Sequence, residues 1–321
     1  MNHSVFLTGA SGFVGSAVLR RLQADGVPTV ATVRGAGASL PAPVKTVRFE
    51  SFEEAGTWGG ALEGCEVVIH CAARVHVMND TEADPLSAFR KVNVDGTLAL
   101  ARQAIAAGVK RFIFVSSIKV NGEGTEPGRP YTADDQPQPQ DPYGISKLEA
   151  EVALQALARE SGLEVVIIRP VLVYGPGVKA NFESMMRWLS KGVPLPFGAL
   201  QNSRSLVALD NLVDLVVTCI GHPAAVNEVF LVSDGEDLST TALLQRMARA
   251  LGKPARLLPV PAWILSGTAN LLGRQALSKR LCGSLQVDIE KTRKVLGWQP
   301  PMGVDAALGA TARHFQETSN K

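Results

Sequence analysis

The chain has few of the features that mark several classes of protein. Its 32 Lys and Arg nearly balance its 30 Asp and Glu, and no long basic block occurs, so no nucleic-acid partner is expected. Four cysteines are present, with no C-x-x-C pair and no histidine at metal-ligand spacing from them. We expect these cysteines to be small core residues in a reducing cytoplasm, and we expect no metal site.

A leader segment and a long hydrophobic run are also missing from the sequence. A strand pattern begins at Val5 with no signal peptide before it. The most apolar late stretch, LLPVPAWILSGTANLLG (257–273), is interrupted by Pro259, Pro261 and Gly267, which predicts no integral membrane segment. A helix lying on a membrane surface stays open for this stretch, but a helix packed on the core or on a lobe is favoured.

The composition that remains is that of a globular protein, with 46% hydrophobic and 19% charged residues in 321. In the first half, short β-branched runs alternate with helical patterns, which predicts right-handed crossovers between parallel strands. The expected strands cover 5–9, 28–33, 67–73, 112–117 and 164–170, and the expected helices cover 13–24, 87–107 and 143–161. We therefore predict an α/β fold of the Rossmann type, with a doubly wound parallel sheet.

After the fifth expected strand the pattern changes to shorter elements punctuated by Gly and Pro. We predict a dinucleotide-binding domain over 1–173 and a smaller C-terminal substrate-binding lobe over 174–321. The chain is free to recross between them around 205–235, and VFLVSD (229–234) is expected to be an extra strand. The Pro- and Gly-rich stretch 121–142 predicts a long loop, which in a compact α/β unit is usually functional.

A glycine-rich loop joins the first strand to the first helix. TGASGFVG supplies Gly9, Gly12 and Gly15, and Phe13 opens the helix. Glycine permits the tight turn and the close approach of the backbone to a pyrophosphate, and the helix N-terminus offers free N–H groups to it. The strand before and the helix after make this context specific, so a nicotinamide dinucleotide is the predicted cofactor.

The end of the second strand lacks the acid that usually holds the adenosine ribose. No Asp or Glu occurs from Gly26 to Phe49, and Arg34 closes the strand. A guanidinium would pair with a 2′-phosphate that a carboxylate would repel. We therefore favour NADP(H) and leave NAD(H) open; Arg34 stacked on adenine or turned to solvent is the alternative.

A Tyr–Lys pair lies at the start of the third helix. Tyr143 and Lys147 are spaced i, i+4 in DPYGISK and share one helix face. We expect the ammonium to lower the pKa of the phenol, so that Tyr143 exchanges a proton with a carbonyl or alcohol oxygen. Ser116 and Ser117 end the strand FIFVSS, where ligands gather in this architecture, and a serine there can hydrogen-bond the reacting oxygen.

These motifs together resemble the extended short-chain dehydrogenases of the nucleotide-sugar epimerase/dehydratase family, over nearly the whole chain. The segments that carry the resemblance are TGASGFVG, HCAA (70–73), NVDGT (93–97), SS with YGISK, and RPVLVYGPG (169–177). The resemblance implies Ser117, Tyr143 and Lys147 as the catalytic residues, with Lys147 also holding the cofactor ribose. It further implies cofactor contacts at Ala72, Ala73, Asn93 and Pro170, and substrate contacts at Asn181 and Arg204.

Within the family, VSSIKVNGE and NFESMMRWLSKGVPLPFG look more like the bacterial O-antigen reductases. This resemblance implies NADPH-dependent reduction of the C4 ketone of a UDP-linked 2-acetamido-2,6-dideoxy-4-hexulose, with Lys119 reaching the sugar or the diphosphate. It also implies a homodimer through the helices at 87–107 and 143–161. Neither the stereochemistry at C4 nor the product, of the quinovosamine or the fucosamine type, is decided by the sequence.

Three alternatives stay open. The first is a UDP-hexose 4-epimerase with tightly bound NAD, although Arg34 stands where epimerases carry an acid. The second is a 4,6-dehydratase, which places an Asp–Glu pair where this chain has Ile118 and Lys119. The third is a catalytically dead dinucleotide-binding scaffold, against which the intact Ser117, Tyr143 and Lys147 argue.

Overall fold

A parallel sheet of seven strands forms the larger part of the fold. The computed structural model describes residues 3–35, 40, 44–49, 58–75, 84–126, 128–271 and 281–319, apart from the side chains of residues 59 and 269. The strands are β1 (Val5–Thr8), β2 (Thr29–Arg34), β3 (Lys45–Phe49), β4 (Val67–His70), β5 (Arg111–Val115), β6 (Glu164–Pro170) and β9 (Val229–Val232). Their order is β3-β2-β1-β4-β5-β6-β9, and every pairing is parallel. This is the predicted Rossmann-type fold, because the order reverses direction between β1 and β4.

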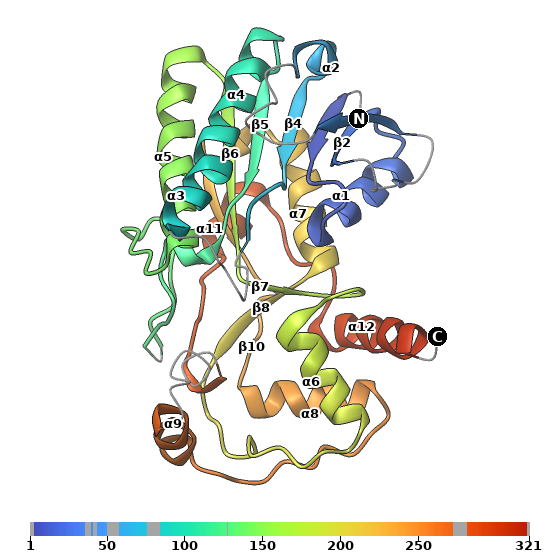
Figure 1. Ribbon diagram of the computed structural model, residues 1–321, viewed down its shortest axis with the longest axis vertical. Helices are drawn as coiled ribbons and strands as arrows, with labels where there is room; N and C mark the ends of the chain where they lie inside the picture. Colours follow the sequence, from blue (N-terminus) through green and yellow to red (C-terminus); the bar gives the residue numbers. More distant parts are fainter. Residues whose placement is uncertain are drawn as a thin grey trace.

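Helices cover both faces of this sheet (Figure 1). They are α1 (Phe13–Ala24), α2 (Gly59–Leu62), α3 (Pro85–Arg90), α4 (Gly96–Ala106), α5 (Pro142–Ser161), α7 (Leu209–Gly221) and α11 (Glu290–Leu296). Alternate strand residues face opposite layers: Val5 and Leu7 share one core with α1 and α7, whereas Phe6 shares the other with α4 and α5. Both faces are thus buried, which explains why the strands read as continuous apolar runs.

Helix boundaries follow local signals in the sequence. The α5 helix begins where the Asp141 side chain accepts a hydrogen bond from the Gly144 N–H at 2.7 Å, with Pro142 in its first turn. It ends at Gly162, whose φ of 76° is left-handed. The helix expected over 87–107 is instead α3 and α4 joined by a π-helical turn, η1 (Lys91–Asp95). Periodicity alone does not reveal such a turn, and these turns often occur at functional sites.

A smaller lobe is built around a three-stranded sheet of order β10-β8-β7. Its strands are β7 (Leu172–Tyr174), β8 (Arg204–Ala208) and β10 (Asp237–Leu238), with β7 parallel and β10 antiparallel to β8. Its helices are α6 (Ala180–Ser190), α8 (Thr240–Ala250), α9 (Ala262–Leu271) and α12 (Val304–Ser319). The chain leaves this lobe after β8 to form α7 and β9 of the larger sheet and then returns. A division into domains at residue 173 stays a prediction.

The long loop predicted at 121–142 connects the two parts of the fold. Tyr131 pairs with Val287 through a parallel β-bridge, and its N–H donates to the Gln286 carbonyl at 2.9 Å. The Thr125 N–H donates to the Ser284 carbonyl at 2.9 Å. Just before the loop, a short 3₁₀ turn, η2 (Ile118–Val120), leads out of the end of β5. A second 3₁₀ turn, η3 (Pro223–Ala225), follows α7. No helix of the described residues is long and apolar enough to cross a membrane.

A buried ion pair joins α5 to the end of β6. The Arg169 guanidinium donates to both carboxylate oxygens of Glu151, with Nη2 to Oε2 at 2.6 Å and Nε to Oε1 at 3.0 Å, and the two side chains are 5% and 2% exposed. Ser116 also donates to Glu151, and the third guanidinium nitrogen donates to Asn121 Oδ1 at 3.0 Å. Every charge in this network therefore has partners, which is the condition for burying it.

Removing one member of the pair is predicted to destabilise the protein strongly. Arg169→Met should lower the free energy of unfolding by about 3–5 kcal/mol, because it leaves the Glu151 carboxylate buried without its cation. Urea denaturation measures the change. The matched control is Arg187→Met, which breaks the exposed pair with Glu183 and should cost under about 1 kcal/mol. Equal losses for the two variants would contradict the assigned role of the buried pair.

Candidate active site

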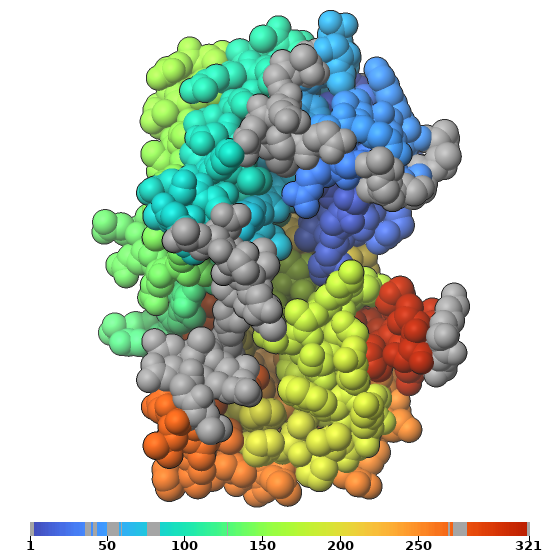
Figure 2. Space-filling model, in the orientation of Figure 1, coloured from blue at the N-terminus to red at the C-terminus, as the bar shows by residue number. Residues whose placement is uncertain are grey.

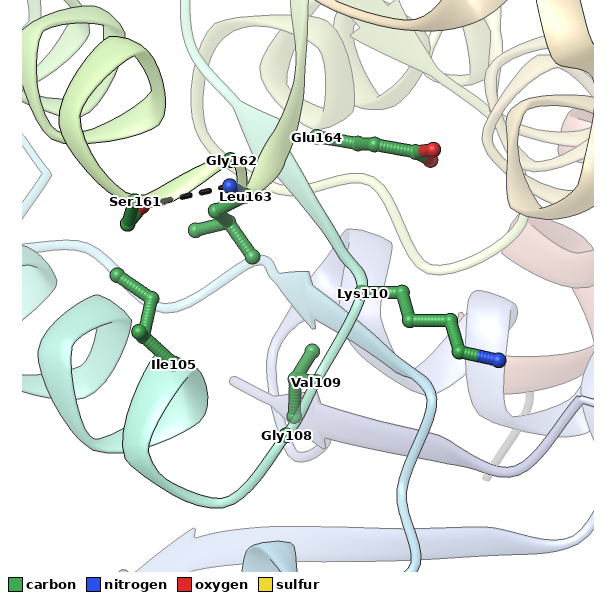
Figure 3. Close-up of a pocket in the computed structure, with 8 residues that line it drawn as sticks. All are labelled: Ile105, Gly108, Val109, Lys110, Ser161, Gly162, Leu163 and Glu164. Atoms are coloured by element: carbon green, nitrogen blue, oxygen red, sulfur yellow. Dashed lines mark hydrogen bonds between the residues drawn. The ribbon is translucent and has the colours of Figure 1, made fainter.

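The candidate site lies at the carboxyl edge of the large sheet, where the segments after β1, β4 and β5 meet. The glycine loop follows β1, residues 71–75 follow β4, and Ser116 and Ser117 follow β5. In open α/β sheets this edge is where ligands bind. The hollow in Figure 3 lies elsewhere, at the opposite edge of the sheet, because its lining residues come just before β5 and β6 or begin β6. They are Ile105, Gly108, Val109, Lys110, Ser161, Gly162, Leu163 and Glu164.

The glycine loop has no room for a side chain at Gly9 or at Gly15. Gly9 has a φ of 72°, and a Cβ there would lie 2.7 Å from the Ala72 backbone nitrogen. A Cβ at Gly15 would lie 2.1 Å from the Gly9 carbonyl oxygen, and one at Gly12 would lie 3.2 Å from it. The helix α1 can therefore sit directly on the loop, and Gly12 caps it without a side-chain hydrogen bond. This cradle of free N–H groups at a helix N-terminus fits a dinucleotide pyrophosphate.

A chain of buried polar groups supports the loop from below. Thr97 Oγ1 donates to the Asn93 carbonyl at 2.7 Å, so it accepts from His70 Nε2 at 3.0 Å. His70 Nδ1 then accepts from the Thr8 hydroxyl at 2.6 Å. Burial lowers the pKa of His70 to about 3, with a further contribution from the charge of Lys147, so the ring is neutral. His70 is thus a structural residue that fixes the ends of β1 and β4.

Asn93 holds the segment that follows β4. Its side chain is 1% exposed and lies in the π-helical turn η1. Its Oδ1 accepts from the Arg74 N–H at 2.8 Å, and its Nδ2 donates to the Arg74 carbonyl at 3.1 Å and to Ser146 Oγ at 3.0 Å. The turn therefore ties residues 71–75, with Ala72 and Ala73, to the helix that carries Tyr143.

Ser117 and Tyr143 meet at the end of β5. The Ser117 hydroxyl lies near enough to the Tyr143 phenol to lower its pKa, and it accepts from the Lys119 N–H at 3.2 Å. Phe89 of α3 packs edge-on against the Tyr143 ring, with ring centroids 6.0 Å apart. Ser116 instead points to Glu151. Of the two candidate serines, Ser117 is therefore the one beside the phenol.

The pKa of Tyr143 differs from the sequence-based expectation. Burial, with a smaller contribution from the Asp141 carboxylate, raises the pKa of Tyr143 to about 12, while the nearby Ser117 hydroxyl acts in the opposite direction. We expected Lys147 to lower it. In the structure the Lys147 ammonium is 2% exposed, donates to the Val115 carbonyl at 2.8 Å and lies 4.2 Å from the centre of the Phe114 ring. Loss of water around the phenol thus outweighs the cation one helical turn away.

The pKa of Lys147 is also shifted by its surroundings. Burial lowers its pKa to about 8, while the charge of Glu151, one turn further along α5, acts in the opposite direction. At neutral pH the side chain is therefore mainly an ammonium. Glu151 is a residue that the sequence analysis missed, although its i, i+4 spacing from Lys147 and i, i+8 spacing from Tyr143 put all three on one face of the helix.

Lys119 pairs with acidic residues of the protein. Its Nζ donates to Asp141 and to Glu123 Oε1, the latter at 3.2 Å. Asp141 also caps α5, and its negative charge raises the pKa of Tyr143. It is a second residue that the sequence analysis missed. The signal was present, because an Asp before Pro is a typical start of a helix.

The other predicted residues lie on the elements around this centre. Arg34 is exposed at the end of β2, Phe13 begins α1, and Pro170 ends β6. Asn181 is exposed near the start of α6, in the smaller lobe. Arg204, at the start of β8, donates to the Gly283 carbonyl at 3.0 Å. The structure thus groups the predicted cofactor residues at one sheet edge and places the two predicted substrate residues across from them in the smaller lobe (Figure 1).

Adding a methyl group at Gly15 is predicted to abolish dinucleotide binding. Gly15→Ala places Cβ against a backbone oxygen at 2.1 Å, and a backbone atom cannot turn aside as a side chain can, so α1 must shift off the loop. Affinity for NAD(H) and NADP(H), measured by calorimetry, should fall at least about tenfold. Gly60→Ala is the control, since nothing lies within 4 Å of a Cβ there. Unchanged binding by Gly15→Ala would remove the loop from the cofactor site.

Neutralising Asp141 is predicted to lower the pKa of Tyr143. Asp141→Asn keeps an oxygen to cap α5 but removes the carboxylate that raises this pKa, so the phenol should titrate at a lower pH than in wild type. The measurement is tyrosinate absorbance against pH, with the Tyr143→Phe titration subtracted. Glu123→Gln, which also removes a partner of Lys119, should leave the Tyr143 titration in place. An unmoved titration in Asp141→Asn would exclude the electrostatic coupling.

Comparison with known proteins agrees with this architecture. The model of the NAD dependent epimerase/dehydratase family matches residues 5–233. A UDP-glucose 4-epimerase of Vibrio cholerae is 50% identical over 100% of this chain and 98% of its own length. A UDP-glucose 4-epimerase of Mycolicibacterium smegmatis is 31% identical over 98% of each chain. The crystal structure of a Thermotoga maritima UDP-glucose 4-epimerase with UDP-glucose superposes with a TM-score of 0.78 and 26% identity, over 98% of this chain and 99% of that one.

The predicted family resemblance is thereby confirmed, and a nicotinamide dinucleotide is supported as the cofactor class. The closer resemblance to O-antigen 4-reductases is not supported by these relatives, all three of which are named 4-epimerases. The chain is an enzyme of the NAD dependent epimerase/dehydratase family.

Proposed function

We propose that this protein is a UDP-hexose 4-epimerase that retains NAD, which was the alternative to the predicted 4-reductase. The observation that carries the proposal is the 50% identity to the Vibrio cholerae UDP-glucose 4-epimerase over the whole chain. The grouping of Ser117, Tyr143 and Lys147 at one sheet edge supports it, because these side chains suit proton exchange with a sugar hydroxyl. The substrate class is therefore a UDP-sugar such as UDP-glucose.

In this proposal the cofactor binds at the carboxyl edge of the large sheet. The glycine loop would hold the pyrophosphate, residues 71–75 would lie beside the nicotinamide, and Lys147 would hold the adjoining ribose. A bound oxidised nicotinamide supplies a hydride acceptor for C4 and a positive charge. Asn93 keeps the 71–75 segment in place through its two hydrogen bonds to Arg74, so the shape of this part of the site is fixed by the protein itself.

Tyr143 is proposed to move the proton of the C4 hydroxyl. With a pKa of about 12 it is a phenol at neutral pH, and a neighbouring positive charge is needed to make it a base. The Lys147 ammonium is one such charge, and it persists up to a pH of about 8 because its own pKa lies there. Ser117, beside the phenol, would stabilise charge on the reacting oxygen.

The smaller lobe is proposed to hold the UDP. Arg204 supplies a guanidinium, which suits a diphosphate, and its hydrogen bond to the Gly283 carbonyl fixes its direction. Asn181 is exposed on α6, where its amide can reach a ligand. Lys119 is paired with Asp141 and Glu123, so we propose that it positions Asp141 near the Tyr143 phenol and does not bind the diphosphate.

A homodimer through α3, α4 and α5 also stays a proposal. Val152, on α5, is 56% exposed.

A second candidate is the predicted NADPH-dependent 4-ketoreductase. The observation that favours it is Arg34, which is exposed at the end of β2, with no carboxylate in the segment from Gly26 to Phe49. A guanidinium there suits a 2′-phosphate. Tyr143 would then be the proton donor to a keto sugar, Lys147 the anchor of the cofactor ribose, and Ser117 the hydrogen-bond partner of the reacting oxygen. The two candidates therefore differ in whether the cofactor is consumed.

Turnover without added cofactor distinguishes the epimerase from the reductase. The purified protein should convert UDP-glucose to UDP-galactose with no nicotinamide supplied, followed by NMR of the sugar. Tyr143→Phe should lower kcat by about 10²–10⁴-fold while UDP-sugar binding persists. Tyr131→Phe, which loses a hydrogen bond to the Gly124 carbonyl outside the site, should stay near wild type.

Strict dependence on added NADPH, with stoichiometric oxidation in the presence of a UDP-4-keto-sugar and no epimerisation of UDP-glucose, would replace the epimerase with the reductase. Wild-type turnover by Tyr143→Phe in either assay would remove the phenol from the chemistry.

A further inference from the structure

The helix α9 (Ala262–Leu271) is an apolar element, and most of its described side chains are exposed. Its sequence, AWILSGTANL, contains no charged residue. Trp263 is 75% exposed and Leu271 is 88% exposed, while Leu258, just before the helix, is 53% exposed. Among the helix side chains that the structure describes, Leu265 and Ser266 are the two that are partly buried. The packed helix expected from the sequence is thus not observed, and an uncharged helix is left in water.

The fold holds this helix outward at the far end of the smaller lobe (Figure 1). The strap before it is fixed to the lobe, because the Leu258 N–H donates to the Leu195 carbonyl at 2.8 Å and the Gly198 N–H donates to the Leu258 carbonyl at 2.8 Å. The segment after residue 280 is fixed as well, since the Leu281 carbonyl accepts from Thr240 Oγ1 at 2.7 Å. In Figure 2 this helix forms an outer corner of the molecule. The exposed helix is therefore carried on a rigid base.

The chain around the helix carries charge of one sign. From Leu238 to Val287 the sequence contains no Asp or Glu. The cations in this stretch are Arg246, Arg249, Lys253, Arg256, Arg274, Lys279 and Arg280. Arg246 is paired with Glu236 and Asp305, but Lys253 and Arg256 are exposed on the strap that leads into α9. An exposed tryptophan and leucines next to lysine and arginine form the pattern of a helix that lies in a membrane interface.

We propose that α9 and its basic strap dock this enzyme on an anionic lipid surface. Trp263, Leu258 and Leu271 would enter the boundary between headgroups and acyl chains, while Lys253 and Arg256 face the lipid phosphates. A second copy of this chain is a poorer occupant, because a two-fold contact would bring the same cations against each other with no acid to offset them. The proposal is independent of the enzyme's substrate.

The docking also sets how the substrate lobe meets the lipid. Asn202 donates to the Gly283 carbonyl at 2.9 Å, and Arg204 donates to the same oxygen at 3.0 Å. The segment that returns from α9 is thus bonded to the β8 region that carries the proposed UDP-binding arginine. A lipid surface under α9 would lie on the side of the smaller lobe and away from the large sheet (Figure 1).

Vesicle sedimentation tests the proposal on the full-length protein. Wild type should sediment with vesicles of phosphatidylglycerol and phosphatidylethanolamine and stay in solution with pure phosphatidylcholine, and added salt should release it. Trp263→Ser with Leu271→Ser should weaken binding at least about tenfold. Lys253→Gln with Arg256→Gln should weaken it several-fold at low salt.

The control exchanges two exposed apolar residues outside this surface. Trp188 is 43% exposed and Val193 is 40% exposed, so Trp188→Ser with Val193→Ser removes similar side chains and should bind vesicles as wild type does. Circular dichroism and melting temperature establish that each variant is folded. Equal binding by the α9 variant and wild type, or equal binding to anionic and neutral vesicles, would overturn the proposal. So would a wild-type oligomer that ignores vesicles and dissociates in Trp263→Ser with Leu271→Ser.

Discussion

The structure depends on a buried ammonium. Lys147 lies under the sheet edge, where water that would solvate its charge is excluded, and burying such an ion costs several kcal/mol unless partners replace the water. The Val115 carbonyl and the face of the Phe114 ring replace part of it. Glu151, one turn along the same helix, adds a negative charge that favours the ammonium. Glu151 is in turn bonded to Arg169 and Ser116, so the groups that stabilise the buried ammonium come directly or indirectly from α5, β5 and β6.

This network explains why the geometry of the candidate site is built into the fold. The same helix carries Tyr143 at its first turn, Lys147 one turn on and Glu151 one turn further. The helix cannot rotate without breaking a buried pair, so the position of the phenol is set by the core and not by the loop that precedes it. The neutral His70 chain fixes the opposite wall of the site in the same way, through groups that are buried and fully bonded. Preorganised groups of this kind need no rearrangement when a ligand binds.

The fold was predictable because its signals are local. Continuous β-branched runs mark buried parallel strands, and caps such as Asp141 and Gly162 mark the ends of helices. The glycine loop was predictable because only glycine fits there. The π-helical turn was not, since an extra residue in a turn leaves the apolar spacing almost unchanged. The electrostatics of Tyr143 were also not predictable, because a residue's distance from water depends on elements far apart in sequence, such as Phe89 and Ser117. Likewise, the pairing of Lys119 with Asp141 joins residues 22 positions apart.

Epimerase and reductase place different demands on one phenol, and its surroundings bear on the choice. A reductase needs a proton donor, and a tyrosine with a pKa of about 12 is protonated in that role at any ordinary pH. An epimerase needs Tyr143 to accept a proton and later return it, so the residue must be able to act as a base in the complete site. Burial makes this possible, because in a poorly solvated site a single added positive charge shifts a pKa far more than it would in water. The high pKa of the free phenol therefore fits a residue that is inactive until a cation completes the site, and it is compatible with the epimerase that the sequence relatives favour.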